Sequence, residues 1–257
     1  MTLNQIDGLA LKSGPLGEKD RLLTFLTNTQ GIIKVSAPGA RKPKSQLSAA
    51  IPLVMMSLQL SGKSSLKSIR SLKIIHSYTS LGQNIESLSA AQALLELTLL
   101  IVGDNDPQPS VFETVILHLN RLEHFQKNNF EKIYSIASSV QAIVHLLALG
   151  GYCLPLQNCS RTGSKLSPPL GEWEWNCSFF PEEGFAIGHF NNARFNLNPS
   201  ELALLQRLLQ PSLPVDKSLK VIGPSKVWLK LIELIESWIE TNLAKKINSI
   251  QLIKSLI

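Results

Sequence analysis

The sequence lacks the features that mark secreted and membrane proteins. Its 257 residues include 3 cysteines, which cannot pair completely, so disulfide bonds are not expected. No apolar run reaches the ~18 residues that a membrane span needs, because Glu96, Gln141 and His145 interrupt the best candidates. The first residues lack the basic start, apolar stretch and small-residue cleavage site of a secretory signal. We therefore expect a cytoplasmic protein with reduced thiols.

Motifs for hydrolysis and nucleotide binding are also missing. The chain contains neither Gly-x-Ser-x-Gly nor His-Glu-x-x-His. Gly62-Lys63-Ser64-Ser65 ends like a phosphate-binding loop, but Ser57 stands where that loop needs a glycine, so we interpret the segment as a hairpin turn. Four glutamates between residues 172 and 183 fit a solvated loop better than a catalytic pair. We predict that the protein is not an enzyme, with a hydrolase that uses these glutamates as an alternative.

Aromatic residues are scarce where positive charge is concentrated. Residues 1–80 carry 11 Lys and Arg against 3 Asp and Glu, a net charge of +8, whereas residues 81–257 carry 14 against 16, a net charge of −2. A basic module joined to a near-neutral one favours a polyanionic partner for the first. Phe25 is the only aromatic residue among the first 75, so nucleic-acid binding there would depend on electrostatics more than on base stacking.

The first 80 residues read as short strands separated by turns. Ile33, Val35 and Ala37 alternate with polar residues, the pattern of a half-buried strand. Turn residues fill 13–17 and 28–31. The predicted strands are Ile6–Lys12, Arg21–Thr27, Ile32–Ala37, Leu53–Leu60 and Leu66–Ile75. We expect an OB-fold β-barrel domain at residues 1–80.

From Gly82 the apolar spacing becomes helical, and we expect an α-helical bundle domain at residues 81–257. An irregular or β-ribbon insertion at 152–198, rich in Pro, Gly and aromatics, interrupts it. The overall class is thus α+β. Residues 245–257 are expected to dock on the bundle. The predicted helices are Ser87–Val102, Val111–Phe125, Phe130–Leu149, Glu201–Leu209 and Lys226–Leu243.

The basic residues of the first domain fall at predicted strand ends and loops, where a small barrel presents its ligand face. The run Arg41-Lys42-Pro43-Lys44 is the densest part and is stiffened by its proline. Such a cluster binds phosphates with little sequence preference and strong salt dependence. A solvated barrel surface is the alternative interpretation. The predicted DNA-binding residues are Lys12, Lys19, Arg21, Lys34, Arg41, Lys42 and Lys44.

The cysteines do not have the spacing of a zinc site. Cys153, Cys159 and Cys177 lie in the insertion with His189 nearby, but structural zinc normally uses ligand pairs two to four residues apart. Thr162 stands where a Cys-x-x-Cys starting at Cys159 would place its second thiol. We therefore expect neither a metal ligand set nor a cofactor, and interpret the thiols as buried or half-buried side chains.

Several segments together resemble the RecO family of bacterial DNA repair proteins. They are Gly17-Glu18-Lys19-Asp20-Arg21-Leu22-Leu23-Thr24-Phe25-Leu26-Thr27, Gly31, Gly39-Ala40-Arg41-Lys42-Pro43-Lys44-Ser45, Leu94-Leu95-Glu96-Leu97, and Leu147-Ala148-Leu149-Gly150-Gly151-Tyr152 leading to Pro155 and Cys159. The resemblance is sharp over residues 1–60, fair to 160 and weak beyond.

The resemblance implies an N-terminal OB barrel, a helical domain and a small zinc-binding insertion. It further implies binding of single- and double-stranded DNA, annealing of complementary strands, and help in placing RecA on strands coated by single-strand-binding protein. Implied partners are RecR and the acidic, apolar C-terminal tail of single-strand-binding protein, with RecA served indirectly, and the implied location is the nucleoid.

This chain departs from the family pattern at the metal. Many members carry two Cys-x-x-Cys pairs, whereas here Cys159 matches the first thiol and Thr162, Ile187 and Phe190 take the other ligand positions. The insertion then resembles a degenerate zinc ribbon. Aromatic packing by Trp173, Trp175, Phe179, Phe180 and Phe185 in place of zinc is our hypothesis for it.

Two other functions fit parts of the sequence. An OB-type RNA-binding module, such as a translation or tRNA-handling factor, would share the basic barrel, and competition between DNA and RNA oligonucleotides separates it from a DNA-binding protein. A non-catalytic protein-interaction adaptor would use the charge for solubility alone. Absence of nucleic-acid binding at low salt would favour the adaptor.

Overall fold

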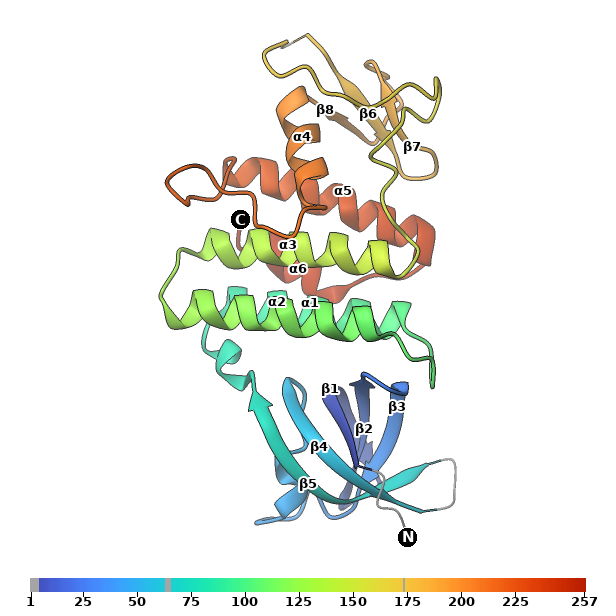
Figure 1. Ribbon diagram of the computed structural model, residues 1–257, viewed down its shortest axis with the longest axis vertical. Coiled ribbons are helices and arrows are strands. Elements are labelled where there is room, and N and C mark those ends of the chain that lie inside the picture. The colour runs from blue at the N-terminus through green and yellow to red at the C-terminus, as the bar shows by residue number, and fades with distance from the viewer. Residues whose placement is uncertain (1–4, 63–65, 173) are drawn as a thin grey trace.

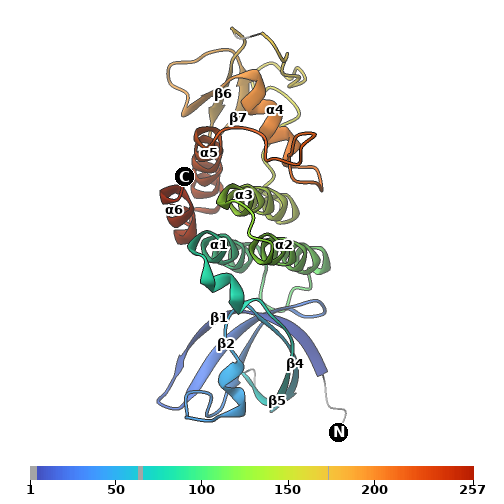
Figure 2. The ribbon, with the colours of Figure 1, turned by 90° about the vertical axis from the view of Figure 1, so that its left-hand side faces the viewer.

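The computed structural model describes residues 5–62, 66–172 and 174–257, with a β-barrel at one end, layered helices in the middle and a small sheet at the other end (Figures 1 and 2). The barrel strands close in the order β1-β2-β3-β5-β4, and β4 pairs back with β1. This OB-like barrel followed by helices confirms the expected fold class. Its strands are β1 (Gln5–Leu16), β2 (Asp20–Thr27), β3 (Gly31–Ala37), β4 (Val54–Ser61) and β5 (Lys67–Ser77).

Alternation along the strands decides what fills the barrel. Ile33, Val35 and Ala37 of β3 belong to its buried core, and Lys34 between them is exposed, as the sequence pattern predicts. Phe25 of β2 is fully buried in the same core. Its ring therefore packs inside the barrel and is not available to stack on a base at the surface.

β1 departs from the prediction in two ways. It continues past Lys12 to Leu16, so most of the expected turn at 13–17 is strand; Pro15 is tolerated there because β1 pairs with β4 only as far as Leu9 and its far end is an edge. A β-bulge also separates the pairs Ala10↔Phe25 and Lys12↔Thr24. The extra residue, Leu11, shifts the alternation so that Lys12 shares the outer face with Thr24.

The helices form layers above the barrel. Figure 2 shows α1 and α2 side by side against the barrel, then α3 and α6, then α5. Among the described residues, α3 is the one helix long and apolar enough to cross a membrane, but 67% of it is buried in the protein, as in a core helix. The helices are α1 (Ile85–Ile101), α2 (Pro109–Lys127), α3 (Lys132–Leu149), α4 (Pro199–Arg207), α5 (Ser225–Leu243) and α6 (Asn248–Ser255).

The end of the chain docks on the bundle, as expected. Ile250 and Ile253 of α6 are buried. The Ser249 hydroxyl donates to Glu96 of α1 at 2.6 Å, and Lys254 forms an ion pair with Glu236 of α5 at 2.6 Å. These polar contacts fix α6 between two helices that are far apart in the sequence.

Barrel and helices share one apolar interface, which we call the seam. Five side chains on the outer face of the barrel are buried in the same hydrophobic core as the helices. Each contributes about 1.5–3 kcal/mol when it leaves water. The barrel is therefore packed on α1 and α2 as a continuous body. The seam residues are Leu9, Leu11, Leu26, Ile32 and Leu53.

A main-chain clamp reinforces the seam at the edge of β3. The α1–α2 loop lies beside β3, where the Ile32 N–H donates to the Gly103 carbonyl at 3.4 Å and the Asn105 N–H donates to the Ile32 carbonyl at 2.9 Å. β5 covers the same edge only at Val35 and Ser36. The loop thus forms a part of the barrel wall that β5 leaves open.

The insertion combines the two expected forms, because irregular chain comes first and a three-stranded sheet in the order β7-β6-β8 follows it. Its strands are β6 (Cys177–Phe180), β7 (Gly184–Ile187) and β8 (Phe195–Leu197). Trp173, one of the aromatics expected to stabilise it, lies outside the described residues. So does most of the expected hairpin turn, at residues 63–65.

Gly31 offers a test of the clamp. Its φ is +63°, and a Cβ at this position would overlap the main-chain carbonyl of Asp106. Gly17 has the same φ of +63° with open space around it, so it is the matched control. We expect Gly17→Ala to cost about 1 kcal/mol and Gly31→Ala about 1–3 kcal/mol more in the free energy of urea unfolding. Equal losses would mean that the clamp does not constrain Gly31.

Candidate nucleic-acid interface

Four of the seven predicted DNA-binding residues meet at the end of the barrel that faces away from the helices. The main chain joins the β1–β2 turn to the loop after β3: the Arg41 N–H donates to the Lys19 carbonyl at 3.0 Å, and the Arg41 guanidinium donates to the Gly17 carbonyl at 3.0 Å. The Asp20 carboxylate accepts from the Gly39 N–H at 2.7 Å. We call the exposed basic residues fixed in this way the distal cluster: Lys19, Arg41, Lys42 and Lys44.

Arg21 has a different place. Its guanidinium donates to the carbonyls of Ser48 and Ala50, at 3.2 and 3.4 Å, beside the short 3-10 helix η1 (Gln46–Ala49). The side chain is only partly exposed. Arg21 therefore ties η1 to the barrel and is less available to a ligand than the distal cluster.

Lys12 and Lys34 lie in one row across three strands, on the outer face that also carries the seam. Thr24 of β2 stands opposite Lys12 of β1 and opposite Lys34 of β3. Side chains opposite each other on one face of an antiparallel sheet lie about 5 Å apart at Cβ. From this row to the β1–β2 turn is about 13 Å along β1. A nucleic-acid strand that follows the outer face of β1 and β2 can thus contact both the row and the distal cluster.

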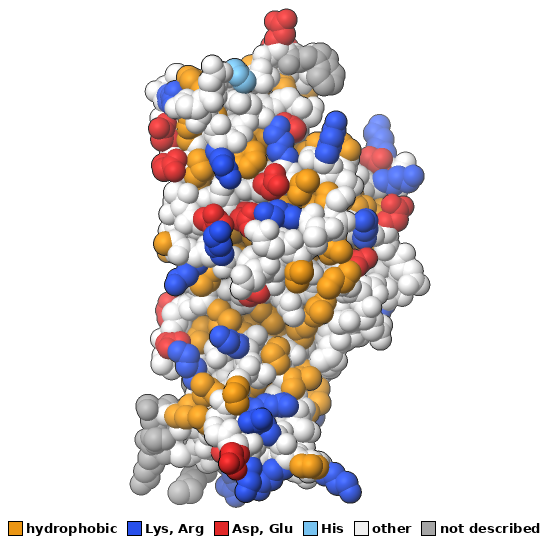
Figure 3. Space-filling view, turned by 180° about the vertical axis from the view of Figure 1, so that it is seen from behind, with side chains coloured by type: hydrophobic (Ala, Val, Ile, Leu, Met, Phe, Trp, Pro, Cys, Tyr) orange, Lys and Arg blue, Asp and Glu red, His pale blue; other side chains and the backbone are white. Residues whose placement is uncertain are grey.

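The row lies in a groove between the barrel and α1. Three hollows, of about 590, 350 and 290 Å³, adjoin there: the first two share Lys12 and Leu99, and the last two share Ile32, Lys34 and Asp104. We call them together the junction groove. Figure 3 shows hydrophobic side chains on the surface around the junction of barrel and helices, and Lys and Arg at the barrel end.

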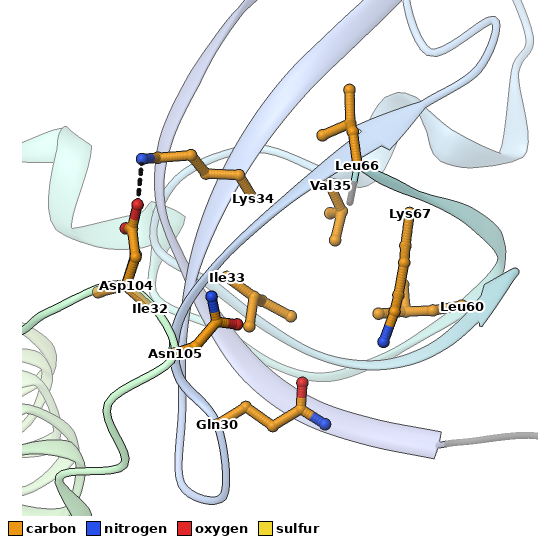
Figure 4. A pocket seen from close by; sticks show the side chains of 10 residues that line it. All are labelled: Gln30, Ile32, Ile33, Lys34, Val35, Leu60, Leu66, Lys67, Asp104 and Asn105. Carbon is orange, nitrogen blue, oxygen red and sulfur yellow. Dashed lines mark hydrogen bonds and ion pairs between the residues drawn. The ribbon is translucent and has the colours of Figure 1, made fainter. Parts of the chain in front are cut away.

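The narrow end of the junction groove lies where β3 and β5 pair in parallel through only two residue pairs, Val35↔Lys67 and Ser36↔Ser68. Ile33, Val35 and Leu60 form its apolar lining. In Figure 4 the Lys34 side chain turns toward Asp104 on one side, and Lys67 extends from β5 on the opposite side. The Lys34 ammonium forms an ion pair with the Asp104 carboxylate at 2.7 Å.

Charge pairing separates the basic residues into two groups. Lys34 is partly neutralised by Asp104, and Arg21 and Arg41 donate to main-chain carbonyls. Four of the predicted residues, Lys12, Lys19, Lys42 and Lys44, and also Lys67 of the groove, are available to phosphates. Within the described part of the chain, no ion pair or hydrogen bond involves their ammonium groups.

Sequence reasoning missed two participants. Lys67 lies in the predicted strand Leu66–Ile75, but its position opposite Val35 depends on a parallel pairing between distant segments that no local pattern reveals. Asp104 lies just beyond the predicted helix Ser87–Val102, and the clamp brings it onto Lys34, 70 residues away. Arg70 and Lys73 of β5 are exposed and add to the positive charge of the barrel.

Comparison with known proteins identifies the family. The model "Recombination protein O N terminal" matches residues 1–78, and "Recombination protein O C terminal" matches residues 82–251. The chain belongs to the RecO family. It is 50% identical to "DNA repair protein RecO" of Prochlorococcus marinus (strain MIT 9303), over 98% of this chain and 95% of that protein. For the proteins of the same name from Synechococcus sp. (strain WH7803) and Synechocystis sp. (strain ATCC 27184 / PCC 6803 / Kazusa), identity is 49% and 33%, over 97% of this chain and 93% and 95% of theirs.

Membership in the RecO family confirms the resemblance seen in the sequence and supports a role in DNA repair. The boundary between the two family models, at 78–82, coincides with the passage from β5 to α1. Both models thus correspond to structural parts that the seam joins.

The residues at the four positions where the family resemblance implies zinc ligands, Cys159, Thr162, Ile187 and Phe190, do not fit zinc. Two of these positions contact Cys159: the Ile187 N–H donates to its sulfur at 3.3 Å, and the Thr162 hydroxyl forms a hydrogen bond with it. Phe190 instead lies against Arg161, whose guanidinium carbon is 4.2 Å from the centre of the Phe190 ring. One thiol, one hydroxyl and two apolar side chains are not a tetrahedral zinc set. No cluster of three or more His, Cys, Asp or Glu able to hold a metal occurs within residues 5–62, 66–172 and 174–257.

The two buried cysteines of the insertion differ in acidity. Burial opposes ionisation of Cys159, but hydrogen bonds from the Thr162 hydroxyl and from the main chain of Ile187, Thr162 and Arg161 outweigh it and lower its pKa to about 7. Burial, with the neighbouring Cys159, raises the pKa of Cys177 to about 12. The Cys159 sulfur thus accepts hydrogen bonds from its own turn and from β7, whereas the Cys177 thiol stays protonated.

Aromatic packing fills the centre of the insertion. Phe179 and Phe185 are fully buried with ring centres 4.8 Å apart, and Trp238 of α5 lies 6.2 Å from Phe179. The Arg161 guanidinium lies over both Phe180 and Phe190, with its carbon 4.5 and 4.2 Å from their ring centres, and the two rings contact each other edge to face. These contacts attach the sheet to α5 without any metal ligand.

We predict that the insertion is stable without zinc. The purified protein should contain far less than one zinc per chain, and a strong chelator should leave its melting temperature unchanged. Phe179→Ala should destabilise the protein by about 3–5 kcal/mol, because it removes a fully buried ring. Metal analysis after growth in zinc-supplemented medium is the decisive control, and one zinc per chain would contradict the prediction.

The contributions of the distal cluster and of the junction groove can be compared by the salt dependence of nucleic-acid binding. Each phosphate contact contributes about 0.7 to the logarithmic salt slope on single strands and 0.9 on duplex. We expect Arg41→Ala/Lys42→Ala/Lys44→Ala to flatten the slope by up to about two units on single strands and three on duplex, and Lys12→Ala/Lys67→Ala by up to about 1.4 on single strands.

A matched control is Lys217→Ala/Lys226→Ala, which removes two exposed lysines from the helical part. It should leave the slope unchanged. Fluorescence anisotropy of a labelled oligonucleotide over a salt series measures all three variants, with melting temperatures to exclude unfolding. An unchanged slope in the distal variant would move the DNA site away from these loops.

Proposed function

We propose that the chain is a non-catalytic mediator of DNA repair and recombination that binds single- and double-stranded DNA and anneals complementary strands. The observation that carries this proposal is the presence of two basic surfaces on one barrel, the distal cluster at its far end and the junction groove beside α1. About 13 Å of β1 separates the Lys12 row of the groove from the β1–β2 turn of the distal cluster. Positive charge on both surfaces reduces the repulsion between two phosphate backbones. Membership in the RecO family supports DNA as the polyanion.

The chemistry of the surface favours binding without sequence preference. Lysine ammonium groups contact phosphates, which fix the position of a strand but carry no sequence information. The single aromatic ring of the barrel is buried, so stacking contributes little at its surface.

We further propose the family partners for this chain: a RecR-like protein, the C-terminal tail of single-strand-binding protein, and RecA, which is helped indirectly onto coated strands in the cytoplasm. The wide end of the junction groove suits an acidic, apolar tail. Leu95, Leu99 and Leu100 supply its apolar lining, and Lys12 supplies positive charge, whereas Lys246 is paired with Glu240 and Glu96 lines the same hollow.

An annealing assay tests the proposal. Two complementary oligonucleotides, one carrying a fluorophore and the other a quencher, are mixed bare and then coated with single-strand-binding protein, across a salt series. We expect acceleration that fades as salt rises and that persists on coated strands.

Matched RNA oligonucleotides serve as the control for the type of nucleic acid. Stronger binding and annealing of RNA would favour an RNA-binding module, because contacts to the 2′-hydroxyl discriminate RNA from DNA. Binding without acceleration would contradict the annealing part of the proposal. No binding at low salt would favour a protein adaptor.

A further inference from the structure

The ion pair between Lys34 and Asp104 occupies the middle of the junction groove. The two groups are 2.7 Å apart, and their side chains are 52% and 58% exposed. Ion pairs with this exposure add little to folding stability, because solvent screens them and ordering two side chains opposes them. The barrel and helices are already joined by the seam. Folding stability therefore does not account for the placement of Asp104 beside Lys34.

Asp104 is placed by the main chain and not by its own side chain. Its neighbours Gly103 and Asn105 form the two hydrogen bonds of the clamp with Ile32, and Asn105 adopts a φ of +57°. The hollow at the centre of the groove is lined by both Asp104 and Lys34. The carboxylate is thus fixed to the barrel surface beside Lys34, which would otherwise face a nucleic-acid strand in the groove.

The position of the carboxylate is that of a phosphate oxygen. An oxygen 2.7 Å from a lysine ammonium, on a half-exposed surface, is the contact that a nucleic-acid backbone makes. Lys12 and Lys67, on the two sides of Lys34 in the same groove, have no such partner among the described residues. Of the four lysines that line the groove in the described part of the chain, Lys34 is the one paired with an acid of the groove itself, whereas Lys246 pairs with Glu240 outside it.

We propose that Asp104 competes with DNA phosphate for Lys34 and keeps strand binding in the junction groove exchangeable. A strand that enters the groove displaces the carboxylate from Lys34, and Asp104 takes Lys34 back when the strand leaves. This proposal rests on the proposed function. An annealing protein has to release each strand once it is paired, and an internal competitor shortens the time that a single strand stays bound.

The test is Asp104→Asn, which keeps the size of the side chain and removes its charge. With an oligo-dT probe we expect the logarithmic salt slope to steepen by about 0.7, one additional phosphate contact, and affinity near 0.1 M salt to rise about three- to fivefold. The dissociation rate, measured by stopped-flow competition, should fall by a similar factor. Asp106→Asn is the matched control, because Asp106 lies in the same loop but accepts from Gln108 and not from Lys34.

A double-mutant cycle with Lys34→Ala shows whether the carboxylate acts through Lys34. In the Lys34→Ala protein, we expect Asp104→Asn to have no more effect than Asp106→Asn. If Asp104→Asn raises affinity equally with and without Lys34, the carboxylate repels DNA directly and the proposal is wrong. It is also wrong if Asp104→Asn and Asp106→Asn behave alike in the wild-type background.

The cycle also separates this proposal from the proposed function. Normal binding and annealing by the wild type, with no difference between the two Asn variants, would overturn the role of Asp104 and leave DNA binding intact. Failure of the wild type to bind oligo-dT at low salt would overturn the proposed function and this inference with it.

Discussion

The packing of the outer barrel face on α1 is the constraint on which the rest of the structure depends. Side chains from three strands, Leu9, Leu26 and Ile32, are buried in the core of the helices. Because both surfaces are close-packed, they fix the angle between barrel and bundle. That angle brings α1 beside the row of Lys12, Thr24 and Lys34 and so creates the junction groove. The same packing delivers the α1–α2 loop, with its carboxylate, to the edge of β3.

Charge and apolar surface have separate tasks in this arrangement. The seam buries the apolar outer side chains that face α1, and the one aromatic ring of the barrel is buried inside. The charged groups at the barrel surface are mostly lysines, which are strongly hydrated and contact phosphates as point charges. Binding by such groups is fast, salt-sensitive and indifferent to sequence. A protein that handles many different strands in turn has use for each of these properties.

The sequence predicts the elements well and their contacts less well. Alternation at Ile33, Val35 and Ala37 and the helical spacing after Gly82 identify the five strands and the main helices, because these periods are local. The bulge at Leu11 escapes a local pattern, since it is visible only in the pairing of β1 with β2. The proximity of Lys67 and of Asp104 to Lys34 depends on segments 33 and 70 residues away, and neither could be read from spacing. The segments that resemble the RecO family indicated DNA as the polyanion, which charge and periodicity alone left open.

The order of synthesis gives the seam a consequence in time. All five barrel strands, the last of which ends at Ser77, leave the ribosome before α1 and the α1–α2 loop do. Until residues 85–105 follow, Leu9, Leu26 and Ile32 stay in water, and the edge of β3 at Ile32 has unpaired main-chain groups. Such surfaces promote association with other chains. The short connection of residues 78–84 keeps this interval brief, because the covering helix is the next element of the chain.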